Sequence, residues 1–192
     1  MAKIRVAGLD GSKRNFGVAI MEIDTRTLEA EVVDLILIKT EKEKSKQVRK
    51  SSDNFRSACQ IAEELPKALK GVTSIFIEVP SGGQSYDAVL GFGIVIGLYA
   101  SIERMLGIPA VEVAPSETKL AAVGTKTASK QEMIEWAFEK FPNAPWRTRK
   151  LKGETVPTLD NEHLADAVAI VHAGMKTPAF RQTLAILTAA AA

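Results

Sequence analysis

The stretch KIRVAGLDGSKRNFGVAIMEID, residues 3–24, decides the fold of this chain. It contains a short apolar segment that ends in Asp10, a turn of glycine and charged residues, and a second apolar segment. The segment AEVVDLILI, residues 30–38, follows after another short turn. Apolar runs separated by short turn sequences are typical of antiparallel hairpins, so we predict three consecutive antiparallel strands.

The remainder of the chain alternates between helical and strand patterns. GVTSIFIEVP, residues 71–80, predicts a buried fourth strand that ends in Glu78, and PAVEVA, residues 109–114, predicts a fifth. We expect helices at about residues 51–69, 86–106, 115–124 and 129–141, and from DNEHLADAVAIV (160–171) onward, with a polar loop over PNAPWRTRKLKGETVPT (142–158). In the first of these helices we expect an inner side formed by Phe55, Cys59, Ile61, Ala62 and Leu65.

This order of elements predicts an α/β fold. We expect a mixed five-stranded sheet, with three antiparallel strands followed by parallel strands, flanked by helices on both faces. A length of 192 residues fits one domain over residues 1–192, and the alanine-rich residues 188–192 are expected to fray.

Composition narrows the class of protein. The net charge is only +2, the hydrophobic fraction is 46%, and the lone Cys59 excludes an intramolecular disulfide. We find no signal-peptide pattern, and the longest apolar run, residues 88–102, is shorter than a bilayer requires, so we expect a cytoplasmic protein without a membrane partner. Basic residues gather locally, at residues 39–56 and 147–152, which are either solvated surfaces or phosphate contacts.

Four ionisable residues stand at element ends. Asp10 and Glu78 end predicted strands, while His163 and Asp166, three residues apart, share one face at the entrance of the last helix. Each alone has an ordinary reading, as a turn aspartate or a hydrogen-bonded polar group. If the sheet brings them together, however, carboxylates packed this closely need a cation between them. Oxygen-rich ligands with few nitrogens favour Mg²⁺ or Mn²⁺, and two such ions can promote phosphodiester hydrolysis.

The chain resembles the RuvC-type Holliday junction resolvases of the RNase H-like superfamily. Four motifs carry the resemblance, in order: GLDGSKRNFGVAI (8–20), FIEVPSGGQSYDAVLGFGIVIG (76–97), APSETKLAAVGTKTASKQEM (114–133) and HLADAVAIVHAG (163–174). It implies a catalytic site that holds two Mg²⁺ or Mn²⁺ ions on Asp10, Glu78, His163 and Asp166. The same resemblance gives Lys119 and Lys130 as catalytic residues that contact phosphate, although each can also be a surface lysine.

Three features depart from the family pattern. Some relatives carry an aromatic wedge three residues after the catalytic glutamate, where this chain has Ser81, so Tyr86 is the alternative wedge. The 142–158 loop is longer than the family's and predicts added DNA contacts from Arg147, Arg149, Lys150 and Lys152, with Trp146 either stacking on DNA or packing in the core. Glu162 has no family counterpart and is either an outer-shell ligand or an acid favoured by the helix dipole.

The resemblance implies a metal-dependent, structure-specific endonuclease that resolves four-way junctions by paired phosphodiester hydrolysis. Two opposed cuts imply a homodimer, for which the helix at residues 86–106 is the candidate interface, in a bacterial or phage-infected cell. Alternatives are a nuclease of the same chemistry for forks, flaps or other branched DNA, an ATPase of the sugar-kinase or actin-like type, and a junction-binding module that does not cleave.

Overall fold

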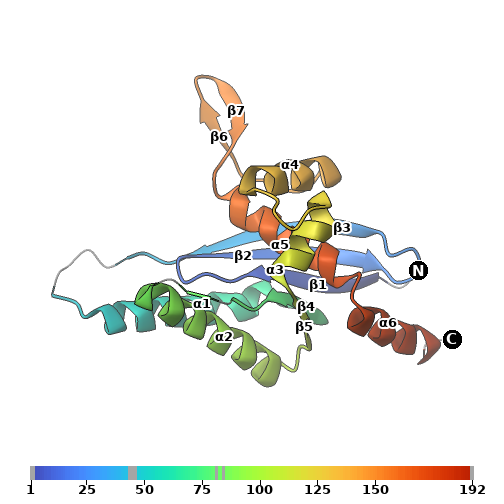
Figure 1. Cartoon of the computed structure of the whole chain (residues 1–192), viewed down its shortest axis with the longest axis horizontal. Helices are drawn as coiled ribbons and strands as arrows, with labels where there is room; N and C mark the ends of the chain where they lie inside the picture. Colours follow the sequence, from blue (N-terminus) through green and yellow to red (C-terminus); the bar gives the residue numbers. More distant parts are fainter. Residues whose placement is uncertain (1–2, 43–46, 81, 84, 191–192) are drawn as a thin grey trace.

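The computed structural model describes residues 3–42, 47–80, 82–83 and 85–190, apart from the side chains of 187–190. Its centre is a five-stranded sheet of order β3-β2-β1-β4-β5 (Figure 1). β1 pairs antiparallel with β2 and parallel with β4, β2 pairs antiparallel with β3, and β4 pairs parallel with β5. The strands are β1 (Lys3–Asp10), β2 (Asn15–Asp24), β3 (Ala30–Lys39), β4 (Ser74–Glu78) and β5 (Ala110–Val113). The predicted mixed sheet is confirmed.

Helices cover both faces of this sheet (Figure 1). α1 (Lys50–Ala68) and α2 (Tyr86–Leu106) lie on one face, and α5 (Asn161–Gly174) lies on the other, with α3 (Pro115–Val123) and α4 (Lys130–Lys140) packed against it. A last helix, α6 (Pro178–Ala190), joins the core on the α5 side through Phe180 and Leu184. α6 continues to Ala190, residues 191–192 lie outside the described residues, and the expectation that residues 188–192 fray stays a prediction.

Side chains alternate along each strand, and this alternation decides on which face of the sheet each side chain lies. In β1, Val6 belongs to the core under α5, whereas Ala7 and Leu9 belong to the core under α1 and α2. In β4, Phe76 faces α5 and its neighbours Ile75 and Ile77 face the opposite core. Since side chains alternate with a period of two, the strand ends at Asp10 and Glu78 fall on the α5 face.

The inner side of α1 differs from the prediction. Phe55 is 71% exposed and Ala62 is also exposed, whereas Asp53, Asn54 and Ser57 are buried. The turn between β1 and β2 explains the difference: Arg14 forms an ion pair with Asp53 and donates to the Ser57 hydroxyl at 2.9 Å. The start of α1 therefore packs through polar side chains, and only its second half, through Ile61 and Leu65, packs through apolar ones.

The segment after α4 is not the polar loop that we predicted. It forms an antiparallel hairpin of β6 (Thr148–Leu151) and β7 (Glu154–Pro157), separate from the main sheet (Figure 1). Lys152 and Gly153 form its turn with positive φ angles of 50° and 89°. Two consecutive positive φ angles are typical of the tight turns that close hairpins, and glycine accepts them without steric cost.

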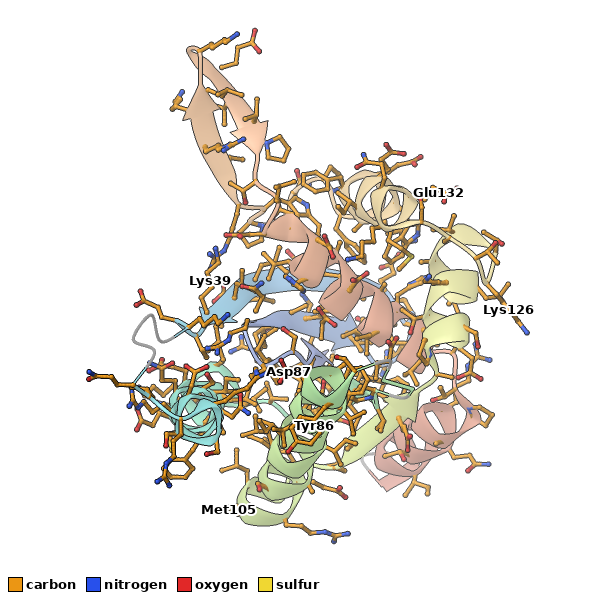
Figure 2. The ribbon with its side chains drawn as sticks, turned by 60° about the vertical axis from the view of Figure 1, so that its left-hand side comes forward. Lys39, Tyr86, Asp87, Met105, Lys126 and Glu132 are labelled. Carbon is orange, nitrogen blue, oxygen red and sulfur yellow. The ribbon has the colours of Figure 1, made fainter. Side chains whose placement is uncertain are left out.

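α2 is more apolar and more exposed than a core helix. By length and composition it is the one helix among the described residues that could cross a membrane, because it extends beyond the apolar run of residues 88–102 that we considered too short. One such helix is weak evidence for a membrane segment. Figure 2 shows Tyr86 and Met105 at its two ends, and these side chains are 78% and 82% exposed.

Two glycines let α5 lie unusually close to the sheet. A Cβ on Gly8 of β1 would collide with the carbonyl oxygen of Ala167, and one on Gly17 of β2 would collide with the carbonyl oxygen of His163. In both cases the obstacle is helix backbone, which cannot rotate away. The bare backbone at these two positions thus sets the distance between α5 and the strands.

We expect Gly8→Ala to destabilise the protein by about 1–3 kcal/mol, because the added methyl forces α5 away from β1. The matched control is Gly91→Ala in α2, where an added Cβ meets no atom within 4 Å. This change should be neutral or raise the free energy of unfolding by about 0.5–1 kcal/mol through better helix propensity. Urea denaturation measures both, and equal effects of the two substitutions would contradict the close approach.

Candidate active site

Two carboxylates meet at the carboxyl ends of neighbouring parallel strands. Leu9 of β1 is paired with Ile77 of β4, so the residues that follow them, Asp10 and Glu78, lie next to each other at the sheet edge. Burial raises the pKa of Glu78, and the nearby charge of Asp10 raises it further. Both effects disfavour the ionised form of Glu78 beside the Asp10 carboxylate.

α5 adds an imidazole to this edge. The Nδ1 atom of His163 lies 2.9 Å from Oδ2 of Asp10, in the first turn of the helix that Gly17 allows to approach. The hydrogen bond to Asp10 raises the pKa of His163, against the opposite effect of burial. With Nδ1 directed at Asp10, the Nε2 atom is the ring nitrogen that remains for another partner.

Asp166 completes the cluster one helical turn later. Burial, followed by the charges of Asp10, Glu78 and Glu162, raises its pKa to about 7. An ordinary aspartate titrates near 3.9, so the surroundings of this carboxyl oppose its negative charge strongly. The four predicted groups therefore interact electrostatically, as the sequence pattern required.

Polar and cationic groups from α3 and α4 border the carboxylates. A hydrogen bond from the buried Thr118 and the charge of Lys119 both act to lower the pKa of Glu78. Lys130 forms an ion pair with Glu162, and this contact raises the pKa of Lys130, with smaller effects from Asp166 and Asp10.

Sequence reasoning missed two of these contacts. For Glu162 the sequence allowed two interpretations, an outer-shell metal ligand or an acid favoured by the helix dipole. In the structure Glu162 forms an ion pair with Lys130. Sequence reasoning also overlooked Thr118, whose position directly before Lys119 on a helix entrance was the available signal.

The donor set fits a hard divalent cation. It offers three carboxylates and one imidazole nitrogen, and the mutual repulsion of the carboxylates is the interaction that a cation relieves. Among the described residues, no three His, Cys, Asp or Glu side chains are already placed tightly enough to hold a metal ion. Side-chain rotations of Asp10, Glu78 and Asp166 would therefore have to accompany binding.

The remaining predicted residues lie outside this cluster. Tyr86 begins α2 with an exposed side chain, and Ser81 lies outside the described residues. Trp146 packs rather than projecting: its ring stacks on Phe138 with centroids 4.6 Å apart, and its Nε1 donates to the carbonyl of Phe141 at 2.9 Å. The basic residues at 147–152 lie at the base and along the length of the β6–β7 hairpin.

The comparisons with known proteins agree with the motif resemblance. No protein-family model matches the chain. The crossover junction endodeoxyribonuclease RuvC of Anaeromyxobacter sp. (strain Fw109-5) is 31% identical over 126 residues, which cover 61% of this chain and 55% of that protein. The chain thus matches about half the length of this relative.

Solved structures of RuvC from T. thermophilus resemble nearly the whole chain. One, in complex with Holliday junction substrate, aligns with a TM-score of 0.63 at 21% identity, covering 94% of this chain and 97% of that one. The T. thermophilus RuvC structure aligns with a TM-score of 0.61, also at 21% identity, over 95% and 97% of the two chains. The chain therefore has the same fold as these RuvC structures, and the predicted resemblance is confirmed.

Without divalent cations, we expect the contribution of Asp166 to the stability of the protein to fall as pH rises from about 4 to about 7, whereas burial lowers the pKa of His172 to about 4 and gives this residue the opposite effect. In this window Asp166 keeps its proton in the folded state and loses it in the unfolded state, so the folded state binds more protons. Asp166→Asn should remove about 2 kcal/mol of this pH dependence in urea denaturation. Mn²⁺ at pH 8 should restore stability to the wild type and much less to the variant.

Glu139→Gln, at an exposed position of α4, is the charge-matched control and should keep the wild-type pH profile. An Asp166→Asn profile that runs parallel to the wild type would show that this carboxyl is not strained by its neighbours.

Proposed function

We propose that this protein is a divalent-metal-dependent endonuclease that resolves four-way DNA junctions by hydrolysing one phosphodiester in each of two opposed strands. One observation carries the proposal: Asp10, Glu78, Asp166 and His163 converge at one sheet edge in a fold that matches a RuvC bound to Holliday junction substrate. A phosphodiester at this edge would meet carboxylates, which repel it, so catalysis there requires cations.

Asp10, Glu78 and Asp166 would hold the ions, with the Nε2 atom of His163 as a fourth donor. The bound ions would supply Lewis-acid activation of the scissile phosphate and neutralise charge on the leaving oxygen. The hydrogen bond to Asp10 orients the ring of His163. If His163 is not a ligand, the same geometry leaves Nε2 free to accept the proton of the attacking water.

Lys119 and Lys130 would bind the substrate's phosphates. The charge of Lys119 acts on Glu78, and the charge of Lys130 interacts with Asp166 and Asp10, so both flank the carboxylates. Lys130 also forms an ion pair with Glu162. The ion pair with Glu162 would keep Lys130 near the site. A phosphate oxygen of the substrate would then compete with the Glu162 carboxylate for this lysine, so Lys130 could change partner from Glu162 to the phosphate.

A homodimer would present two such sites to opposed strands. The exposed side of α2 contains Val89, Gly93 and Ile96, which follow one another at helical spacing. Small and apolar residues in this arrangement allow two helices to pack closely, and burial in a dimer would explain an apolar surface that faces solvent in one chain. Tyr86, at the exposed start of the same helix, is the candidate wedge. We expect the enzyme to act in the cytoplasm.

In the presence of Mg²⁺ or Mn²⁺, the purified protein should cut a synthetic four-way junction much faster than a linear duplex of the same sequence, and chelation with EDTA should abolish cutting. Asp10→Asn should bind the junction with wild-type affinity but cut it roughly 10²- to 10³-fold more slowly, because the carboxylate between the other site groups is lost. Gel-resolved cleavage products measure both.

A cruciform plasmid provides the control for the dimer. Paired cuts within one binding event linearise the plasmid, whereas independent cuts accumulate a nicked circle first. Forks and flaps cut as fast as the four-way junction would favour the broader branched-DNA nuclease. Binding without cutting would favour the non-cleaving module, and ATP turnover without DNA would favour the kinase-like reading.

A further inference from the structure

No residue of the β6–β7 hairpin belongs to the hydrophobic clusters that the described residues form. Its strands pair with each other and with no other strand among the described residues, and Figure 1 shows the hairpin extending away from α4 and α5. All eight strand positions except Val156 are exposed. A two-stranded ribbon without a packed face is only marginally stable in isolation, so its presence calls for a function outside the fold.

The hairpin carries an excess of positive charge. Residues 147–158 contain four basic residues and one acid, Glu154. Arg147, at the base, lies 3.6 Å from Asp160, but Arg149, Lys150 and Lys152 have no ion-pair partner within the part of the chain that the structure describes. Unpaired cations on an exposed arm are typical of a surface that binds phosphates.

The base of the hairpin is fixed to the active-site helix. Asn161, the first residue of α5, is 1% exposed. Its Oδ1 accepts a hydrogen bond from the backbone N–H of Arg147 at 2.9 Å, and its Nδ2 donates to the carbonyl of Arg147 at 2.8 Å. The N–H of Thr158 also donates to that carbonyl, at 3.0 Å, which closes the base from the other strand. Since Asn161 precedes His163 by two residues, the arm begins at the edge of the candidate active site.

Cations lie on both faces of the ribbon and at its tip. Arg149 and Lys150 are consecutive residues of β6, so their side chains leave opposite faces, and Lys152 lies in the turn. A ribbon that rested flat on DNA would need cations on one face only. Four residues of strand reach about 13 Å, and a major groove about 12 Å wide and 8.5 Å deep admits a two-stranded ribbon between two phosphate backbones.

We propose that the β6–β7 hairpin is a DNA-binding arm that enters the groove of a duplex segment beside the cleaved strand, with Arg149, Lys150 and Lys152 contacting phosphates on both sides of the groove. This inference rests on the proposed function, since it assumes a DNA substrate. Asn161 then acts as a positioning residue that holds the arm in a constant relation to His163 and Asp166.

The test compares two triple variants of equal charge in an Asp10→Asn background, which should bind the junction but cut it slowly. The hairpin variant is Arg149→Gln, Lys150→Gln and Lys152→Gln. The control is Arg26→Gln, Lys70→Gln and Arg104→Gln, three exposed residues near the end of the sheet where β2 ends and β4 and β5 begin, opposite to Asp10. Junction affinity is measured between 50 and 200 mM salt, where each lost phosphate contact lowers the salt slope by about 0.9.

The hairpin variant should lose about two to three units of the salt slope and bind at least about tenfold more weakly, while the control keeps the parent's slope. Replacing residues 148–157 by two glycines should have the same effect on binding without lowering the melting temperature, since the hairpin supports no core. For the groove, a photocrosslinker is placed on Glu154→Cys in a Cys59→Ser background. It should attach to one duplex segment of the junction.

Two failures are distinguishable. If the parent chain neither binds nor cuts junctions, the proposed function fails, and this inference fails with it. If the parent does both but the hairpin and control variants have the same salt slope, the arm does not bind DNA and the proposed function stands. Crosslinks confined to single-stranded DNA, or absent, would overturn the groove placement.

Discussion

The close approach of α5 to the sheet is the constraint on which the candidate site depends. The backbone of α5 occupies the space that side chains at Gly8 and Gly17 would fill. The backbones of β1 and β2 therefore contact the backbone of α5 directly at these two positions. Gly17 is paired with Asp10 across the sheet, and the helix atom it accommodates belongs to His163. The same two contacts that seat the helix therefore bring His163 within hydrogen-bond distance of Asp10.

The close packing of α5 against the sheet buries carboxylates near one another, and their mutual repulsion makes the site suitable for cations. A helix held farther away would leave Asp166 hydrated and ordinary, whereas here burial and neighbouring carboxylates push its pKa to about 7. The protein offsets part of the repulsion with Lys119 beside Glu78 and with the pair of Lys130 and Glu162. The rest stays uncompensated by the described side chains, as expected where a divalent ion or a metal-bound phosphate is to be bound.

Much of this arrangement was predictable because it follows from local patterns. The alternation in β1 and β4 places Asp10 and Glu78 on one face, and the three-residue spacing of His163 and Asp166 puts both on one side of α5. The prediction failed where tertiary contacts override pattern. Phe55 is exposed and Asp53 is buried in its place, because Arg14, which is distant in sequence, forms an ion pair with Asp53. The hairpin was missed because its strands are short and polar and carry no burial signal. The catalytic roles of the four site residues stay predictions.

The central claim is that the cluster at the edge of β1, β4 and α5 binds divalent metal. Crystals grown with Mn²⁺ test it most directly, because anomalous scattering locates manganese independently of any assumed ligand. The account predicts anomalous peaks coordinated by Asp10 together with Glu78 or Asp166, with the carboxylates rotated toward the ion. Manganese bound only elsewhere on the protein, with the pair of Asp10 and His163 undisturbed, would contradict it.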